Sequence, residues 1–254
     1  MISRLILSNN IKARRSWSWR IVLFFATLPL VLLLIFAFLS NGQVNTNPDI
    51  EYTDLWKRFV FSVHWILIFS LPLGITIQAS ITANIEHQGN SWKQTLSLPL
   101  KKSDVYISKF ITLLMYNMFS AVILTLGIIT IGVVFGIGRN IEWYTVLAGG
   151  FYPYIAALPI MAIQLWLSIS ITNQAFPIIF GTVFGMAGLF FSMNKFTKWL
   201  PWAYPVNATP VTVISDTNNM ILNHDIHYIV IIAIIEGVLL LFLGLVNFLK
   251  REVY

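Results

Sequence analysis

The chain contains no cysteine and very little charge. With no cysteine among 254 residues, disulfide bridges, thiolate metal sites and a cysteine nucleophile are excluded. Only 10% of the residues are charged and 57% are hydrophobic, whereas a soluble domain carries about 25% charged residues and has no interior for so much apolar surface. The composition therefore excludes an ordinary soluble enzyme and a disordered chain, and it indicates an integral membrane protein.

The familiar catalytic motifs are also missing. The sequence has no H-E-x-x-H, no G-x-S-x-G and no G-x-x-x-x-G-K-[ST]. Every aspartate lies outside the apolar stretches, so an intramembrane aspartyl pair is excluded. Of the four histidines, His224 and His227 lie three residues apart, but they lack a third ligand. We therefore predict a chain that is not an enzyme and that holds no metal or cofactor of its own.

Six stretches are long and apolar enough to cross a bilayer, which takes roughly 20 residues. The fourth and fifth are separated only by residues 172–175, where Pro177 favours a break. The sequence predicts an all-α integral membrane fold, one transmembrane domain over residues 1–254. The expected spans are residues 21–39, 59–83, 110–135, 145–171, 176–193 and 228–249.

The basic residues are distributed unevenly between the two ends of these spans. Eleven of the sixteen lysines and arginines fall in the leader, the loop after the second span and the tail. Because cytoplasmic loops carry the excess of lysine and arginine, both chain ends are predicted to be cytoplasmic. The net charge of +6 thus reports topology, and we expect no nucleic-acid partner.

Three segments outside the spans are long enough to matter. Residues 1–20 are predicted to form an amphipathic helix at the inner membrane interface, with one face made of Ile2, Leu5, Ile6 and Asn9. The alternative is a basic tail that only fixes the orientation of the chain in the membrane. Residues 84–109 form a cytoplasmic loop. The sequence of residues 194–227 predicts a short helical element that is interfacial or re-entrant. The alternative is an ordinary aromatic belt at the membrane interface. Its aromatic residues include Trp199, Trp202 and Tyr204.

Glu236 is the single ionisable residue placed deep in a predicted span. Such residues are costly in lipid and suggest a function. Glu236 could line a substrate path, pair with a basic group or hydrogen-bond as a neutral acid to another helix. No lysine or arginine is expected at its depth, so we expect polar neighbours such as Gln164, Ser168 or Asn117.

The loop after the second span has the character of a docking element. A polar turn is expected to expose Glu86, Gly89 and Asn90, while Trp92 and Leu96, four residues apart, could anchor a short helix. The glutamate, the tryptophan, Leu-Ser-Leu-Pro at 96–99, the lysines at 101 and 102 and Ser-Lys at 108–109 resemble the pattern of ABC-2 type permeases. The resemblance is closest to the small permeases of the lantibiotic-immunity group, which export bacteriocins.

The resemblance implies a set of partners. Such permeases work as pairs of identical or related chains in the bacterial cytoplasmic membrane, with a separate ATP-binding subunit that carries ATP and Mg²⁺. The leader and a coupling helix in the loop would contact that subunit, and the element before the last span would gate the outer mouth through Trp199, Trp202 and Tyr204. The coupling residues implied are Glu86, His87, Gln88, Gly89, Asn90, Ser91, Trp92 and Lys93.

The expected substrate is an amphiphilic peptide of the antimicrobial, bacteriocin or toxin kind, which already partitions into the membrane interface. Export of a drug, a lipid-linked glycan or sodium is the alternative within the family. A six-helix transporter outside the family is the second alternative, although it would normally need more intramembrane polar sites and an internal repeat. The candidate path residues are Phe24, Phe25, Trp65, Phe69, Tyr116 and Glu236.

Overall fold

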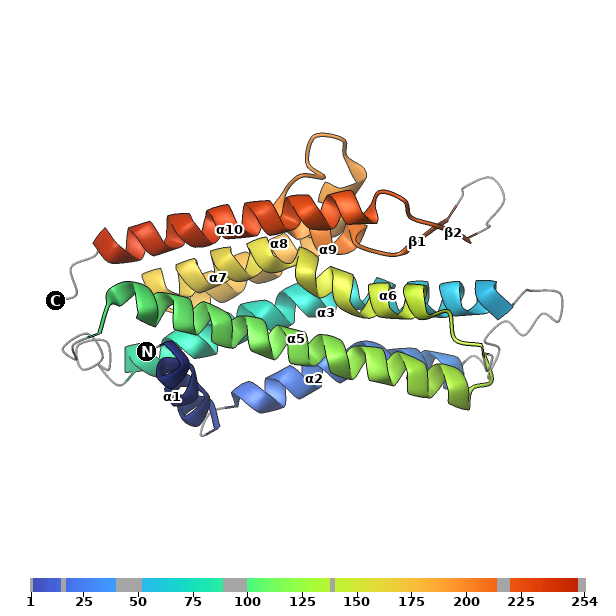
Figure 1. Cartoon of the computed structure of the whole chain (residues 1–254), viewed down its shortest axis with the longest axis horizontal. Helices are drawn as coiled ribbons and strands as arrows, with labels where there is room; N and C mark the ends of the chain where they lie inside the picture. Colours follow the sequence, from blue (N-terminus) through green and yellow to red (C-terminus); the bar gives the residue numbers. More distant parts are fainter. Residues whose placement is uncertain are drawn as a thin grey trace.

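A computed structural model describes residues 2–14, 17–39, 52–88, 100–137, 140–213 and 220–250. Its long helices run nearly parallel to one long axis (Figure 1). Within the described ranges, six helical stretches are long and apolar enough to cross a membrane, as the sequence predicts. They are Ser18–Phe36, Leu55–Gln88, Lys102–Val134, Trp143–Ser170, Ala175–Met193 and Ile226–Lys250.

The start of α1 (Ile2–Arg14), the end of α3 (Tyr52–Gln88), the start of α5 (Lys102–Val134) and the end of α10 (Ile226–Lys250) lie at the same end of the bundle (Figure 1). We call this the terminal end. The helices, in chain order, are α1 Ile2–Arg14, α2 Ser18–Leu39, α3 Tyr52–Gln88, α5 Lys102–Val134, α6 Trp143–Ala156, α7 Leu158–Ser170, α8 Ala175–Met193, η1 Pro201–Ala203, α9 Tyr204–Asn207 and α10 Ile226–Lys250.

Two helices are longer than predicted. α3 continues to Gln88 and α5 begins at Lys102, so most of the expected loop at 84–109 belongs to helices or lies outside the described residues. The predicted boundaries were placed where charged and polar residues end each apolar run. Both helices continue past these points, so the predicted boundaries lie inside the helices. α3 has 37 residues and therefore spans about 55 Å.

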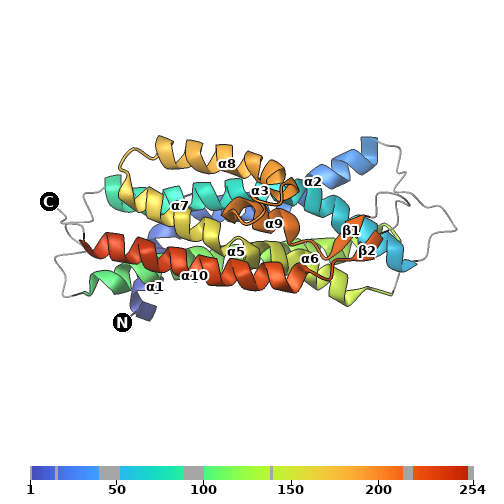
Figure 2. The ribbon, with the colours of Figure 1, turned by 90° about the horizontal axis from the view of Figure 1, so that it is seen from above.

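The fourth predicted span is divided into α6 and α7, with Ala157 as the break between them. Pro159 at the start of α7 has no N–H to donate to the preceding turn, which is sufficient to interrupt a helix. α7 and α10 pack along each other, and α3 lies between α2 on one side and α8 on the other (Figure 2).

The region between α8 and α10 is only partly helical. The 3₁₀ helix η1 and the short α9 lie beside the end of α8, which stops well short of the far end of α3 (Figure 2). Strands β1 Val211–Val213 and β2 Met220–Leu222 then pair antiparallel, with Val211 opposite Leu222. The helical element was predicted and the hairpin was not, so the fold is mainly rather than wholly α-helical. We call residues 194–210 the outer element.

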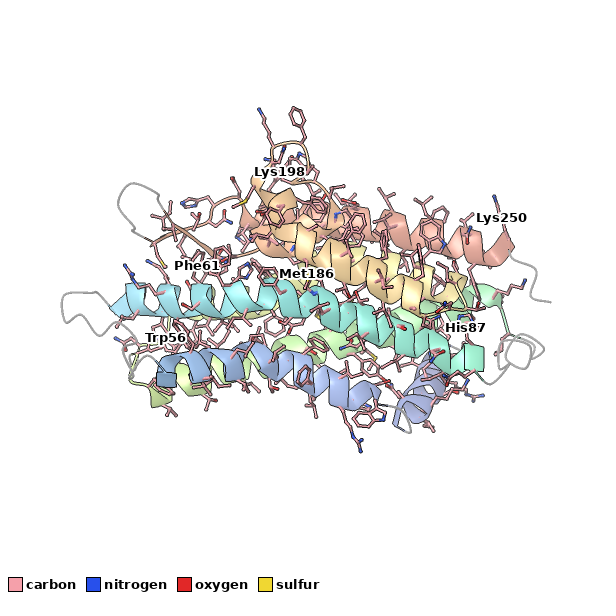
Figure 3. The ribbon with its side chains drawn as sticks, turned by 180° about the vertical axis from the view of Figure 1, so that it is seen from behind. Trp56, Phe61, His87, Met186, Lys198 and Lys250 are labelled. Atoms are coloured by element: carbon pink, nitrogen blue, oxygen red, sulfur yellow. The ribbon has the colours of Figure 1, made fainter. Side chains whose placement is uncertain are left out.

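Close packing between the long helices depends on glycine. On α8, a Cβ at Gly185 would lie 3.0 Å from the Pro72 side chain of α3, and one at Gly181 would collide with Thr76 and Gln164. On α5, Gly132 leaves the space that the ring of Trp56 fills, and Figure 3 shows Trp56 inside the bundle. Gly132 stands four residues before Gly136, and Gly181 four before Gly185, in the G-x-x-x-G spacing that allows helices to approach closely. The described contacts place this spacing in packing within the chain.

Candidate functional site

Three helices meet at a buried cluster of charges at the terminal end of the bundle. Glu86, near the end of α3, is 1% exposed, and Lys109 of α5 is 2% exposed. The Lys109 ammonium lies 3.1 Å from Glu86 Oε1, and the Lys12 ammonium of α1 lies 2.8 Å from the same oxygen. We call Lys12, Glu86 and Lys109 the charge triad.

The charge triad is asymmetric in its burial. Glu86 and Lys109 form a neutral pair in the interior, and Lys109 also donates to the carbonyl of Thr82 at 3.3 Å. The side chain of Lys12 is 38% exposed. Removing Lys12 would leave a paired interior, whereas removing Glu86 would leave a buried cation without its counterion, which costs far more.

Helix α1 packs on the bundle through a polar face. Asn9 donates to the hydroxyls of Ser108 (3.3 Å) and Thr112 (3.5 Å), and Tyr116 donates to Asn10 at 3.0 Å. Leu7 and Ile11 on the opposite face of the helix are 62% and 55% exposed. The helix was predicted, and its orientation places Asn9 inward. A small pocket lies under it, lined by residues that include Asn9, Lys12, Glu86, Thr112 and Tyr116.

The charge triad corrects one prediction. Glu86 does not lie in an exposed turn, because α3 continues past it and buries it. His87 bonds the carbonyl of Ser168 at 3.1 Å, and Gln88 is exposed at the end of α3. The other predicted coupling residues lie outside the described residues: Gly89, Asn90, Ser91, Trp92 and Lys93.

The predicted path residues do not share one environment. Phe24, Trp65 and Phe69 are 56%, 46% and 38% exposed on the surface of α2 and α3. Phe25 instead packs against Gly74 of α3, and Tyr116 is 2% exposed beneath α1. The structure therefore brings part of this set to the surface that would face lipid or a neighbouring chain.

The predicted outer aromatics divide in the same way. Trp202 is buried against Phe180 and Phe184 of α8, with ring centroids 5.6 and 4.9 Å away, while Trp199 is 40% exposed. Tyr204 is 2% exposed, and its hydroxyl oxygen lies within hydrogen-bond distance of Glu236 Oε2, at 2.5 Å. The hydrogen-bond partner of Glu236 is therefore Tyr204, not one of the three polar residues expected.

Those three polar residues lie elsewhere in the core. Asn117 donates to Gln78 of α3 at 3.4 Å. Gln164 of α7 is fully buried, and neither its amide nitrogen nor its amide oxygen has a hydrogen-bond partner. Within the described ranges, no three histidine, aspartate or glutamate side chains gather at one place.

Sequence reasoning missed Lys12 and Lys109 as members of a site, because both were counted as basic residues that set orientation. One signal was available. Lys109 directly precedes the apolar run of the third predicted span. If the helix of that span begins several residues earlier, Lys109 lies inside the packed helix and its charge needs a partner. Its spacing from Glu86 could not show that the partner lies on α3.

Comparison with known proteins supports the permease interpretation. A family model described as an ABC-2 family transporter protein matches residues 5–188, which is more than half of the chain. The match includes most of α1, the charge triad, the segment after α3 and most of α8. A comparison with individually curated proteins gives no match. The chain belongs to the ABC-2 family of transporter proteins.

Proposed function

We propose that this chain is the permease subunit of an ATP-driven exporter in a bacterial cytoplasmic membrane, with both chain ends in the cytoplasm. A separate ATP-binding subunit, which holds ATP and Mg²⁺, docks at the terminal end over α1 and residues 86–93. A second permease chain, identical or homologous, completes the pathway. Membership of the ABC-2 family supports the ATP-binding partner.

The charge triad is the observation that carries this proposal. One buried carboxylate joins α1, α3 and α5, and it lies three residues before the segment that would form the coupling helix. The end of a rigid helix cannot move without moving its neighbours when a buried ion pair ties them. A push on α1 or on the residues after Gln88 would therefore reach two of the longest helices at once.

This arrangement gives the chain a mechanical role. Closure of the ATP-binding subunits would favour one of two arrangements of the permease pair, and differential binding to those arrangements is all that a shift requires. In this proposal α1, α3 and α5 receive the movement as one body. The outer element responds farther along α3, where His64 bonds the backbone carbonyl of Val206 at 2.9 Å.

The surface of α2 and α3 supports an amphiphilic peptide as the substrate. Phe61, Trp65 and Phe69 recur every four residues and therefore share one side of α3, and Phe61 and Trp65 contact edge to face. Phe24 adds an exposed ring from the adjacent α2. Figure 3 places Phe61 on the surface of α3. Aromatic rings of this kind favour an amphiphilic ligand that approaches from the membrane interface.

Deletion of the gene tests the substrate class. We expect the deletion to sensitise cells to a cationic amphiphilic peptide, measured as a lower inhibitory concentration, with little change for unrelated small drugs. Re-expression of the wild-type chain should restore resistance. Sensitivity to small drugs, to sodium or to cell-wall antibiotics in place of the peptide would favour the alternative substrates and contradict the peptide assignment.

Replacement of Lys12 by methionine tests the coupling role. The buried Glu86–Lys109 pair survives this change, so we expect normal folding and normal recovery of the complex. A hydrogen bond to a charged group contributes about 1.5–3 kcal/mol, and its loss should lower transport roughly tenfold while ATP hydrolysis continues. The measurement is transport per ATP hydrolysed in proteoliposomes. Lys101→Met is the matched control, because Lys101 is exposed at the same end.

A covalent bond should replace the lost ion pair. Because the chain has no cysteine, Asn9→Cys with Ser108→Cys introduces the only two thiols, at side chains 3.3 Å apart. In the Lys12→Met background, oxidising the two thiols to a disulfide with a mild external oxidant should restore transport per ATP. If the joined protein transports no better than Lys12→Met alone, Lys12 does not act by holding α1 to the bundle.

A further inference from the structure

The hydroxyl of Tyr204 lies between two hydrogen-bond acceptors. Its oxygen is 2.8 Å from the backbone carbonyl oxygen of Trp199 and 2.5 Å from Oε2 of Glu236. A phenol carries one proton, and an ionised carboxylate and a carbonyl carry none. If Glu236 were ionised, one proton would have to serve two contacts, and one pair of oxygens would meet lone pair to lone pair.

The environment keeps the proton on Tyr204. Burial raises the pKa of the Tyr204 hydroxyl above its ordinary value, and so do the hydrogen bond with Glu236 and the nearby carboxyl charge. Loss of the tyrosine proton therefore does not resolve the conflict. A proton on Glu236 does resolve it, because Glu236 then donates to Tyr204 and Tyr204 donates to the Trp199 carbonyl.

The described residues around Glu236 offer no charge to balance it when it is ionised. The ion pairs of the charge triad lie away from it, at the terminal end. Helix α7 carries no titratable residue, and Lys198 lies against the ring of Trp199 at 4.7 Å, on a loop that projects from the bundle (Figure 3). The other titratable groups on the elements packed against α10, or on α10 itself, are Tyr144, Tyr152 and Tyr154 of α6, Lys102, Asp104, Tyr106, Lys109 and Tyr116 of α5, and His227, Tyr228 and Lys250; Lys102 and Asp104 lie in the first turn of α5, at the terminal end.

Of these groups, His227 lies beside Tyr144 and Tyr152 near the start of α10, nine residues before Glu236. Tyr106 reaches α10 at Gly244 and Phe248, two turns beyond it. Glu236 itself is the eleventh residue of the 25-residue α10 and so lies near mid-depth of the bundle. An unpaired charge is most costly at that depth.

We propose that Glu236 is a proton-binding site and that the bound proton holds the outer element on α10. With the proton present, every group in the series of hydrogen bonds Glu236–Tyr204–Trp199 has a partner. This series ties α10 to both ends of the segment 199–204. Without it, the carboxylate lacks a counterion and Tyr204 can satisfy only one of its two acceptors. Loss of the proton therefore favours release of the outer element toward water.

Carbodiimide labelling measures the protonation state directly, because dicyclohexylcarbodiimide reacts with a protonated carboxyl in an apolar site. We expect mass spectrometry of the intact protein in lipid to find the label on Glu236 at pH 7 and to find it lost as the pH is raised. Asp225, which is exposed, should stay unlabelled at pH 7. An unlabelled Glu236 at pH 7 would overturn the proposal. This measurement needs no ATP-binding subunit, so its outcome is separate from that of the proposed function.

Glu236→Gln provides the functional control, because the glutamine amide donates an N–H where the protonated acid donates its O–H. We expect this variant to lose the fall in transport that the wild type should show when the pH is raised, so that the ratio of its transport at high pH to its transport at pH 7 is close to one. Tyr204→Phe interrupts the chain without adding charge and should lower transport severalfold at every pH. An inactive Glu236→Gln variant in a normally assembled complex would show that the carboxylate is required, and would contradict a holding role for the proton.

Discussion

Replacing Glu86 with glutamine is expected to destabilise the permease by about 3–5 kcal/mol, the usual cost of removing one partner from a buried ion pair. The change leaves Lys109, which is 2% exposed, without its counterion, and it also frees Lys12. The expected result is a sharp fall in the thermal midpoint in detergent and in the yield of folded protein. Asp104→Asn is the matched control. It also removes a carboxylate from the same end of the bundle, but Asp104 belongs to none of the ion pairs found between described residues.

A second variant removes both buried charges, and so separates their effect on stability from their effect on the coupling of transport to ATP hydrolysis. Glu86→Leu with Lys109→Met removes both buried charges, and apolar replacements for a buried pair are often neutral or stabilising. We expect this double variant to regain much of the lost stability but not the coupling of transport to ATP hydrolysis, since Lys12 has nothing left to bind. Full coupling in the double variant would show that the charge triad is only a packing element.

Replacing Gly188 with alanine is the second change with a large expected effect. A Cβ at this position would lie 2.6 Å from the backbone carbonyl oxygen of Trp202, so either α8 or the outer element must move. Overpacking of this kind costs about 1–3 kcal/mol. We expect transport to fall more than tenfold, because a displaced Trp202 leaves its site against Phe184 and carries Tyr204 away from Glu236. The measurement is transport by the purified complex.

The neighbouring position provides the control for Gly188. Ala187→Val adds volume to the same turn of α8, at a residue that is only half-buried, and it should transport normally. If Gly188→Ala is recovered in normal amounts and transports like the wild type, the contact between α8 and Trp202 is not needed for the transport cycle. The role of the outer element as a gate would then be wrong.

The sequence predicts the bundle well because lipid constrains a helix strongly. Six apolar stretches of the required length leave few alternatives, and all six are confirmed as helical stretches long enough to span, the fourth with a break at Ala157. The break at Ala157 was not predicted. Pro159 lies inside an apolar run, and the hydropathy of that run is the same whether one helix or two cross the membrane.

The site was harder to predict than the fold, because its members come from distant parts of the chain. Glu86 and Lys109 are 23 residues apart and Lys12 is 74 residues from Glu86, so no local pattern joins them. Tyr204 and Glu236 were each identified as candidates, yet their contact depends on how the outer element folds back beside α8. Local sequence shows that a buried charge needs a partner, and only the tertiary fold shows which partner it has.

One cross-linking measurement tests the central claim that an ATP-binding subunit drives this permease from the terminal end. Gln88 is exposed at the end of α3, and Lys198 is partly exposed on the loop beyond α8. Figure 3 shows Lys198 far from His87, which is next to Gln88 in the sequence. Each is replaced by cysteine in turn, in a chain that has no other, and carries a photoactivated thiol reagent in native cells. The account predicts that a P-loop ATPase is captured from position 88 and not from position 198. Capture from position 198 alone, or capture of no ATPase from position 88, would contradict it.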